Sequence, residues 1–172
     1  MTPSLGRLGR GPCEAAERPR RKRLRLAEFD YSEPGLLYFA TLRADSRRAP
    51  FAIAALAQAV VAALLHERET GRALIHAYVL MPDHLHVVLS LGDAGTALPA
   101  LMAAFKSYTT GLSWRFGCSG RLWQRSYYEH IVRRAEEART VCEYILGNPV
   151  RSGLTKQVGD WPYAGLPDEL PI

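Results

Sequence analysis

Apolar and polar residues follow two periodicities along this chain, one typical of strands and one typical of helices. Residues 36–42 are rich in aromatic and aliphatic side chains, and residues 84–91 form a largely apolar run behind a Pro-Asp turn, so both are predicted as strands. Residues 51–69 are rich in alanine and end before Gly71, which predicts a helix. The full predicted order is strand 36–42, helix 51–69, strand 73–80, strand 84–91, helix 98–116, strand 127–132 and helix 136–146.

That order of elements predicts an α+β fold. Two split β-α-β halves, with helices segregated against an antiparallel sheet, describe a ferredoxin-like sandwich. We expect four or five strands, with the helices 51–69 and 98–116 packed on one face of the sheet. The residues from Val150 onward contain Pro, Gly and Trp161 and are expected to be irregular. The expected core is Phe39, Ile53, Leu56, Val60, Leu64, Val79, Val87, Leu89, Leu101, Phe105 and Ile145.

The first residues of the chain differ in charge from the rest. The 172 residues are 48% hydrophobic, which suits one globular domain, predicted for residues 29–172. Residues 1–28 have no periodic apolar face and are predicted to form a disordered arm. Of the net charge of +5, residues 1–26 carry eight Lys or Arg against two Glu, so the remainder is close to neutral. Such an arm either binds a polyanion such as nucleic acid or is a solvated extension that binds nothing specific.

Several protein classes are excluded by composition. The longest apolar run, residues 51–65, is interrupted by Gln58 and is too short to span a bilayer, and no apolar signal core follows the N-terminus. The three cysteines lie far apart without a CxxC pair, so neither a disulfide framework nor a zinc cluster is indicated. We therefore expect a cytoplasmic protein without a membrane partner, associated with the nucleoid if it binds DNA.

Two histidines begin the strand 84–91. His84 and His86 are one residue apart, and side chains on a strand alternate between faces, so both point the same way. Two imidazoles on one face of a rigid strand make half of a divalent-metal site. Two solvent-facing histidines on an edge strand would give the same pattern, so the spacing alone leaves both interpretations open.

A second pair of polar residues lies at the end of the helix 136–146. Tyr144 and Asn148 are four residues apart and so project from one helix face. A tyrosine there commonly packs in the core, and an asparagine commonly caps the helix. Together with the histidines, however, the amide oxygen of Asn148 is a hard ligand suited to Mg²⁺ or Mn²⁺. A tyrosyl oxygen beside such a metal could attack a phosphodiester.

Four blocks of sequence make the comparison with a family specific. These blocks are residues 37–43, 76–86, 105–108 with 122–130, and 143–150. In these blocks, which stand in family order, the chain resembles the REP-associated tyrosine transposases, which belong to the single-tyrosine nucleases with a His-hydrophobe-His (HUH) motif. The resemblance covers roughly residues 33–165.

The resemblance implies a role for each residue of the two pairs. His84 and His86 would bind a divalent metal, Mg²⁺ or Mn²⁺, and Asn148 would occupy the position of a third polar ligand. Tyr144 would be the nucleophile of a single-stranded DNA endonuclease and strand transferase that forms a 5′-phosphotyrosine intermediate. The family usually recognises imperfect palindromes folded as single-stranded DNA hairpins, which implies the substrate. We expect a monomer or a homodimer.

Two other functions stay open at this point. The chain could be a DNA-hairpin-binding protein that has kept the fold and lost the chemistry, or an interaction module with structural histidines. A basic stretch over residues 105–134, with aromatic residues between the charges, favours nucleic acid as the partner. The residues predicted to contact DNA are Lys106, Arg121, Arg125, Arg133, Arg134 and Tyr127.

Overall fold

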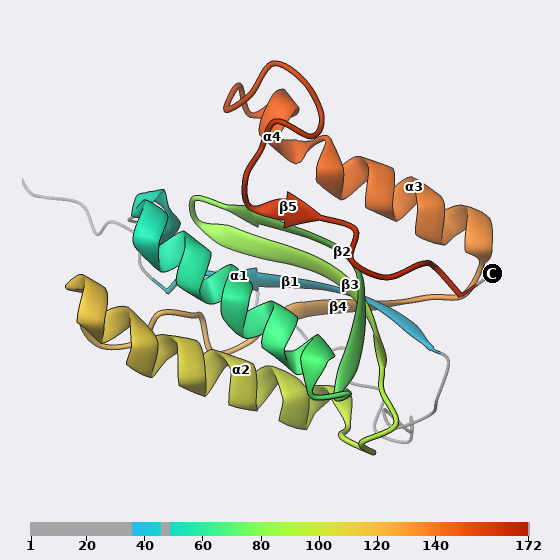
Figure 1. Cartoon of the computed structure of the whole chain (residues 1–172), viewed down its shortest axis with the longest axis horizontal. Coiled ribbons are helices and arrows are strands. Elements are labelled where there is room, and N and C mark those ends of the chain that lie inside the picture. Colours follow the sequence, from blue (N-terminus) through green and yellow to red (C-terminus); the bar gives the residue numbers. More distant parts are fainter. Residues whose placement is uncertain (1–35, 46–48, 172) are drawn as a thin grey trace, which may run out of the picture.

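The computed structural model describes residues 36–45 and 49–171, and the predicted arm 1–28 lies outside them. Within this part of the chain, five strands form one antiparallel sheet in the order β4-β1-β3-β2-β5 (Figure 1). Because β3 lies between β1 and β2, the β1-α1-β2 unit is split, as predicted. The strands are β1 Leu37–Arg43, β2 Ala73–Met81, β3 His84–Leu91, β4 Tyr128–Val132 and β5 Ala164–Gly165.

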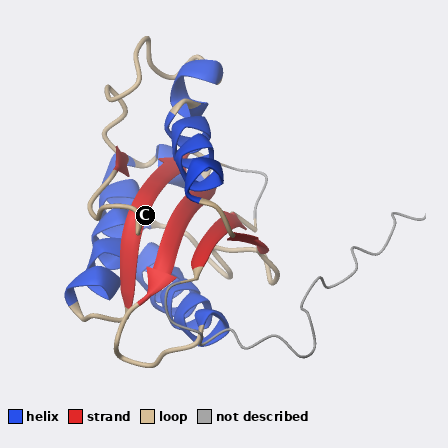
Figure 2. Cartoon of the chain, turned by 90° about the vertical axis from the view of Figure 1, so that its right-hand side faces the viewer, coloured by secondary structure: helices blue, strands red, loops and turns tan. Residues whose placement is uncertain are grey.

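Helices cover both faces of this sheet (Figure 2). Helices α1 and α2 pack side by side on one face, which confirms the predicted placement of these two helices. Helix α3 covers part of the opposite face, mainly over β2. The helices are α1 Ala54–Glu69, α2 Leu98–Ser113, α3 Ala135–Leu146 and α4 Asn148–Arg151, with short 3₁₀ turns η1 Pro50–Ala52 and η2 Trp114–Phe116.

Strand alternation divides the side chains between these two faces. Leu85 and Val87 of β3 enter the core beneath α1 and α2, so the histidines between and before them point to the face that carries α3. In β1, Tyr38 and Ala40 belong to the α1 and α2 side, whereas Phe39 packs against the cluster beneath α3. The face that holds α3 is therefore the face that holds the candidate site.

Most of the predicted core is buried. Nine of the eleven residues are buried, Phe39 is half-buried, and Ile53 is 43% exposed, so the prediction for Ile53 is wrong. Ile53 is the residue before α1 and has an extended backbone, which takes its side chain out of the helical face. The buried residues are Leu56, Val60, Leu64, Val79, Val87, Leu89, Leu101, Phe105 and Ile145.

The residues after α3 are more regular than the sequence indicated. After Gly147, residues Asn148–Arg151 form α4, with Pro149 in its first turn, where a missing N–H costs nothing. Gly147, not Asn148, is the C-cap of α3.

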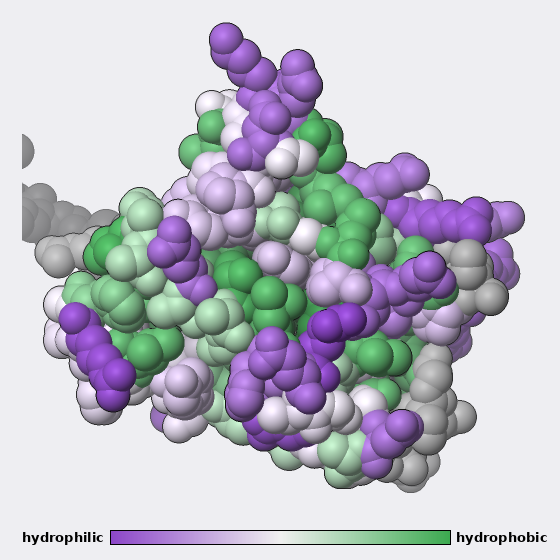
Figure 3. Space-filling model, in the orientation of Figure 1, coloured by the Kyte–Doolittle hydropathy of each residue, from purple (hydrophilic) through white to green (hydrophobic). Residues whose placement is uncertain are grey.

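Hydrophobic side chains gather near the centre of the surface in Figure 3, and hydrophilic side chains surround them. No helix in the described residues has the length and apolar character needed to cross a membrane.

The last described residues follow the outer edge of β2. The Leu80 N–H donates to the Tyr163 carbonyl at 2.8 Å, and the Trp161 indole donates to the Leu80 carbonyl at 2.8 Å. Directly after Tyr163, β5 pairs with Tyr78 and Val79 of β2. Further on, the Asp168 carboxylate accepts a bond from the Ile75 N–H at 2.8 Å. This C-terminal segment, residues 161–170, thus satisfies backbone groups that β2 would otherwise leave open.

Candidate active site

His84 and His86 lie together at the start of β3. Both are half-buried on the face that carries α3, with ring centroids 4.6 Å apart and their Nε2 atoms 3.1 Å apart. The alternation predicted from their spacing is therefore present. Because β3 is an inner strand, paired on both sides, the alternative of two histidines on an edge strand does not hold.

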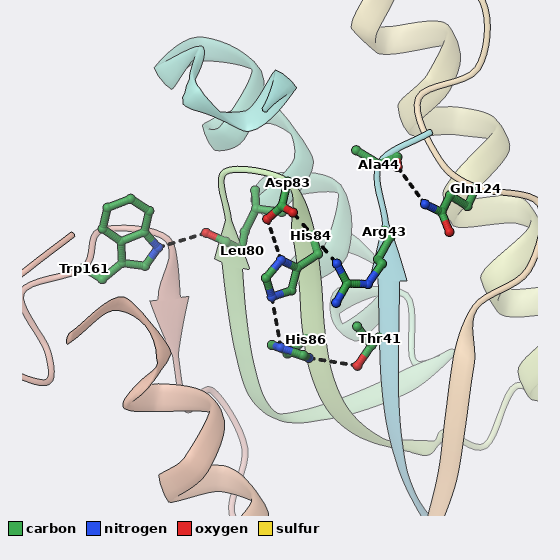
Figure 4. A network of polar contacts seen from close by, with 9 residues as sticks. All are labelled: Thr41, Arg43, Ala44, Leu80, Asp83, His84, His86, Gln124 and Trp161. Atoms are coloured by element: carbon green, nitrogen blue, oxygen red, sulfur yellow. Dashed lines mark hydrogen bonds and ion pairs between the residues drawn. The ribbon is translucent and has the colours of Figure 1, made fainter. Parts of the chain in front are cut away.

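Neighbouring side chains fix the orientation of both rings (Figure 4). The Nδ1 of His84 contacts the Asp83 carboxylate at 2.6 Å, and the Nδ1 of His86 contacts the Thr41 hydroxyl at 2.8 Å. Arg43, paired with His84 across the strands, places its guanidinium 3.9 Å from the same carboxylate. Metal-bound histidines commonly have such a partner on the second nitrogen, which leaves the other nitrogen for the ion. Here the two remaining nitrogens are the Nε2 atoms that face each other.

The spacing of these nitrogens fits two ligands of one metal ion. With metal–nitrogen bonds of about 2.1 Å, two ligands lie about 3.0 Å apart at a right angle and about 3.4 Å apart at a tetrahedral angle. The observed 3.1 Å falls in that range. No group of three His, Cys, Asp or Glu in residues 36–45 and 49–171 could hold a metal. A cation here would complete its shell with an amide, a substrate oxygen or water.

Burial keeps His86 neutral. Burial is the main cause that lowers the pKa of His86 to about 3; the nearby His84, Arg43 and Arg151 act in the same direction, and Asp83 opposes them. A neutral imidazole offers its lone pair, which is the form a metal requires. His86 is therefore neutral at physiological pH.

Tyr144 and Asn148 lie at the junction of α3 and α4. Tyr144 is 56% exposed, so it does not pack in the core. The guanidinium of Arg151 lies 4.3 Å from the centre of its ring and donates to the Tyr144 carbonyl and to the Asn148 amide oxygen. The Asn148 amide nitrogen is buried without a hydrogen-bond partner. Arg151 also fits closely over Gly147, where a Cβ would lie 2.6 Å from its Nη1.

Arg151 connects the two halves of the site. Ile145, next to Tyr144, packs with Val79 in the cluster beneath α3, so the helix end and the histidines share one face. The charge of Arg151 also acts on His86. Among the described residues, no hydrogen bond joins Tyr144 or Asn148 to either imidazole. The structure thus gathers all four predicted residues on one face and shows Asn148 engaged with Arg151.

The predicted DNA-contacting residues are more scattered. Lys106 is half-buried, and its amine donates to the carbonyls of Gln124 and Arg125 at 2.7 and 2.9 Å. Arg121 forms an ion pair with Asp45 at 3.2 Å. Tyr127 is half-buried against the core beneath α1 and α2, with the Lys106 amine 5.9 Å from its ring centre. Contact with DNA stays a prediction for these three and for the exposed Arg125, Arg133 and Arg134.

Sequence reasoning missed three residues of the site. Thr41 could be found only from the pairing of β1 with β3, which places it opposite His86. Asp83 lies in the turn before the histidines and was treated as a turn residue. Arg151 had a sequence signal, because Tyr144, Asn148 and Arg151 follow the i, i+4, i+7 spacing of one helix face.

Comparison with known proteins assigns the chain to a family. The family model described as "Transposase IS200 like" matches residues 37–148, more than half of the chain, so the chain belongs to this family. The REP-associated tyrosine transposase of Escherichia coli (strain K12) is 31% identical over 91 residues, which cover 52% of each protein. A putative REP-associated tyrosine transposase of Haemophilus influenzae is 29% identical over 101 residues, 52% of this chain and 57% of the relative. The chain thus spans about half the length of these relatives.

A solved structure supports the fold over a longer range. The chain is similar to the structure of a REP-associated tyrosine transposase bound to a REP hairpin, with 25% identity and a TM-score of 0.64 over 79% of each chain. The five-stranded antiparallel sheet with helices on it therefore confirms the predicted α+β class.

Proposed function

We propose that this chain is a metal-dependent single-stranded DNA endonuclease and strand transferase that acts on DNA hairpins. The observation that carries the proposal is the convergence of two Nε2 atoms, 3.1 Å apart, on the sheet face where Tyr144 lies exposed. Membership of the IS200-like family supports a transposase role, and the solved relative was bound to a REP hairpin.

In the proposed reaction, the Tyr144 hydroxyl oxygen attacks the scissile phosphorus. The bond from phosphorus to the tyrosyl oxygen forms as the bond from phosphorus to the 3′-oxygen breaks. The phenolic proton leaves to water, and the departing 3′-oxygen takes up a proton. The products are a 5′-phosphotyrosine and a free 3′-hydroxyl, and attack by a 3′-hydroxyl reverses the step and joins strands.

The side chains around Tyr144 have separate tasks in this reaction. His84 and His86 would hold Mg²⁺ or Mn²⁺, oriented by Asp83 and Thr41 through their Nδ1 atoms. A bound divalent ion supplies charge that stabilises the pentavalent phosphate and helps the phenol, whose ordinary pKa is about 10, to lose its proton. Asn148 would become a ligand only after its amide oxygen leaves Arg151.

The test is a covalent-adduct gel with labelled hairpin oligonucleotides taken from repeats that flank the coding sequence. The wild type should form a protein–DNA adduct that EDTA abolishes and Mg²⁺ or Mn²⁺ restores. Tyr144→Phe should form no adduct while hairpin binding and metal affinity stay within about twofold, because only the attacking oxygen is removed. His84→Ala with His86→Ala should abolish cleavage and weaken metal binding.

Two results would contradict the proposal. An adduct formed by Tyr144→Phe would assign the nucleophile to another tyrosine. Hairpin binding by the wild type without cleavage, under every divalent metal tried, would favour the non-cleaving hairpin-binding protein.

Asn148→Ala should lose only part of the cleavage activity, because water can fill a vacated position on Mg²⁺.

A further inference from the structure

An aromatic surface continues the candidate site toward the β4 edge of the sheet. In the strand register, Thr41 of β1 lies opposite His86 on one side and opposite Tyr128 of β4 on the other. Directly paired residues share a face, so Tyr128 and the histidines point the same way. Phe39, two residues before Thr41, belongs to the same face.

The rings form a continuous series. Phe39 lies 5.6 Å from the His86 ring, with 32° between the planes, and 6.2 Å from the Tyr128 ring in an edge-on arrangement. Phe39 is half-buried, whereas Tyr128 is 53% exposed. Tyr128 is distinguished from the other exposed aromatic residues by its place in this series of rings, which begins at His86.

Helix α3 does not cover this surface. Its buried residues form one cluster with Leu37, Val132 and Val79, and its contacts with the sheet are mainly with β2. The hydrogen bond between the His130 ring and the Glu137 carboxylate, 2.8 Å long, joins the start of α3 to β4. Tyr128 is the first residue of β4, at the other end of the strand from Val132 and two residues before His130.

We propose that Phe39 and Tyr128 form a binding site for an unpaired nucleobase of single-stranded DNA, adjacent to the histidine pair. The proposal rests on the proposed function, and it assigns a partner to a surface that the reaction itself does not use. Neighbouring strands are about 4.8 Å apart, so Tyr128 lies about 10 Å from His86 across the sheet. A base next to a phosphate held at the histidines would reach that distance.

The chemistry of the surface selects a nucleobase over an apolar peptide. Stacking on an exposed ring suits a flat π-system, which every base offers. Two exposed cations lie on the histidine side of these rings: Arg43 is paired with His84 across the strands, and the charge of Arg151 acts on His86. A base with a flanking phosphate would meet both a ring and a positive charge.

Two adjacent tyrosines point to opposite faces of the sheet, and only one of them belongs to the proposed site. Tyr127 points toward the core beneath α1 and α2, and Tyr128 points to the open face, because strand alternation gives them opposite directions. Tyr108 supplies a matched control, since it is 64% exposed but lies on α2, which covers the other face of the sheet.

The experiment measures binding of oligothymidylate that carries one 2-aminopurine, in EDTA so that no cleavage interferes. Tyr128→Ala should weaken binding about tenfold and reduce the quenching of the 2-aminopurine, because a stacked base is lost. Tyr128→Phe should bind within twofold of the wild type, since the ring remains. Tyr108→Ala should bind as the wild type does, and duplex DNA should show no dependence on residue 128.

Three outcomes would overturn the inference. They are equal binding by Tyr128→Ala and the wild type, an equal loss with Tyr128→Phe, and no detectable binding of the oligonucleotide by the wild type. Failure of the proposed function gives a different result, namely normal stacking without a covalent adduct on any hairpin. A melting curve for each variant verifies that it is folded.

Discussion

Arg151 contacts both predicted residues of the α3–α4 junction. Its guanidinium lies over the Tyr144 ring, donates to the Asn148 amide oxygen, and adds positive charge near His86. A guanidinium presents planar paired donors that match the oxygens of a phosphate. A scissile phosphate bound near the histidines would therefore compete with Asn148 for Arg151 and leave the amide oxygen available to a metal.

This competition predicts the behaviour of variants at residue 151. Arg151→Ala should slow single-turnover adduct formation by about 100-fold, because one charged donor to the reacting phosphate is removed. The rate of adduct formation by Arg151→Lys should lie between those of the wild type and Arg151→Ala, since the charge stays and the paired geometry is lost. Arg115→Ala, an exposed arginine on η2, is the control and should react at the wild-type rate. Adduct formation by Arg151→Ala at that rate would exclude the role.

Single residues also show where sequence reasoning reaches its limit. The spacing of His84 and His86 was enough to predict a shared face, because alternation is a property of any strand. The same rule could not decide between Tyr127 and Tyr128, because it does not say which face of β4 is covered. Tyr127, which is predicted to contact DNA, is half-buried against the core beneath α1 and α2, and Tyr128 is the more exposed ring.

At the scale of elements, α2 supports the segment that leads to β4. The Lys106 amine of α2 donates to the Gln124 and Arg125 carbonyls, and burial lowers its pKa. These bonds hold the chain just before Tyr127 and Tyr128. Lys106 was predicted as a DNA contact, and its position points first to support of this segment.

Replacing Lys106 separates these two roles. Lys106→Met keeps most of the side-chain volume but removes the donors, so the free energy of unfolding should fall by about 1–2 kcal/mol in chemical denaturation. Arg125→Met is the comparison, since its side chain is exposed, and it should leave stability unchanged. Unchanged stability of Lys106→Met, together with weaker DNA binding, would show that Lys106 is a DNA contact after all.

The elements that could be predicted from the sequence are long, whereas the elements that could not be predicted are short and depend on their neighbours. The alanine-rich segment of α1 and the apolar run of β3 are long enough for composition to indicate their type, so these elements and their order were predicted. Helix α4 has four residues and β5 has two, and neither is long enough for a period to show. β5 exists through its pairing with β2, where Gly165 lies against the Tyr78 ring and a Cβ would approach it to 2.8 Å.

Across the whole molecule, His76 links the sheet to the C-terminal segment. It lies at a register shift in β2, is 1% exposed, and contacts the Glu169 carbonyl at 2.6 Å and the Ser90 hydroxyl at 2.9 Å. Because a carbonyl only accepts, Nδ1 carries the proton, and Nε2 accepts from Ser90. Burial lowers the pKa of His76, although the Glu169 contact and the charge of Asp168 oppose that shift.

The lowered pKa predicts a loss of stability in acid. An unfolded histidine titrates near pH 6.5, so below that pH the unfolded chain binds a proton that folded His76 resists. The free energy of unfolding should therefore fall as pH decreases from 7 to 5. His76→Gln should make this dependence shallower, by at most about 1.4 kcal/mol per pH unit for one proton. Urea denaturation at several pH values measures both slopes.

The comparison of slopes isolates His76 from the other histidines, which stay in both proteins. A wild-type slope equal to that of His76→Gln would contradict the prediction. A folded pKa above 6.5 would give the opposite sign, with stability lost as pH rises.

The C-terminal segment along β2 has a consequence for how chains meet each other. A bare outer strand exposes a row of N–H and C=O groups, which is a template for pairing with another chain. The β2 sequence, with Ile75, Tyr78, Val79 and Leu80, has the apolar, uncharged character of segments that stack into amyloid-like sheets. Residues 161–170 occupy that edge with the chain's own backbone. Their removal by a protease would therefore expose a strand edge to which another chain can pair, and the cleaved protein should aggregate.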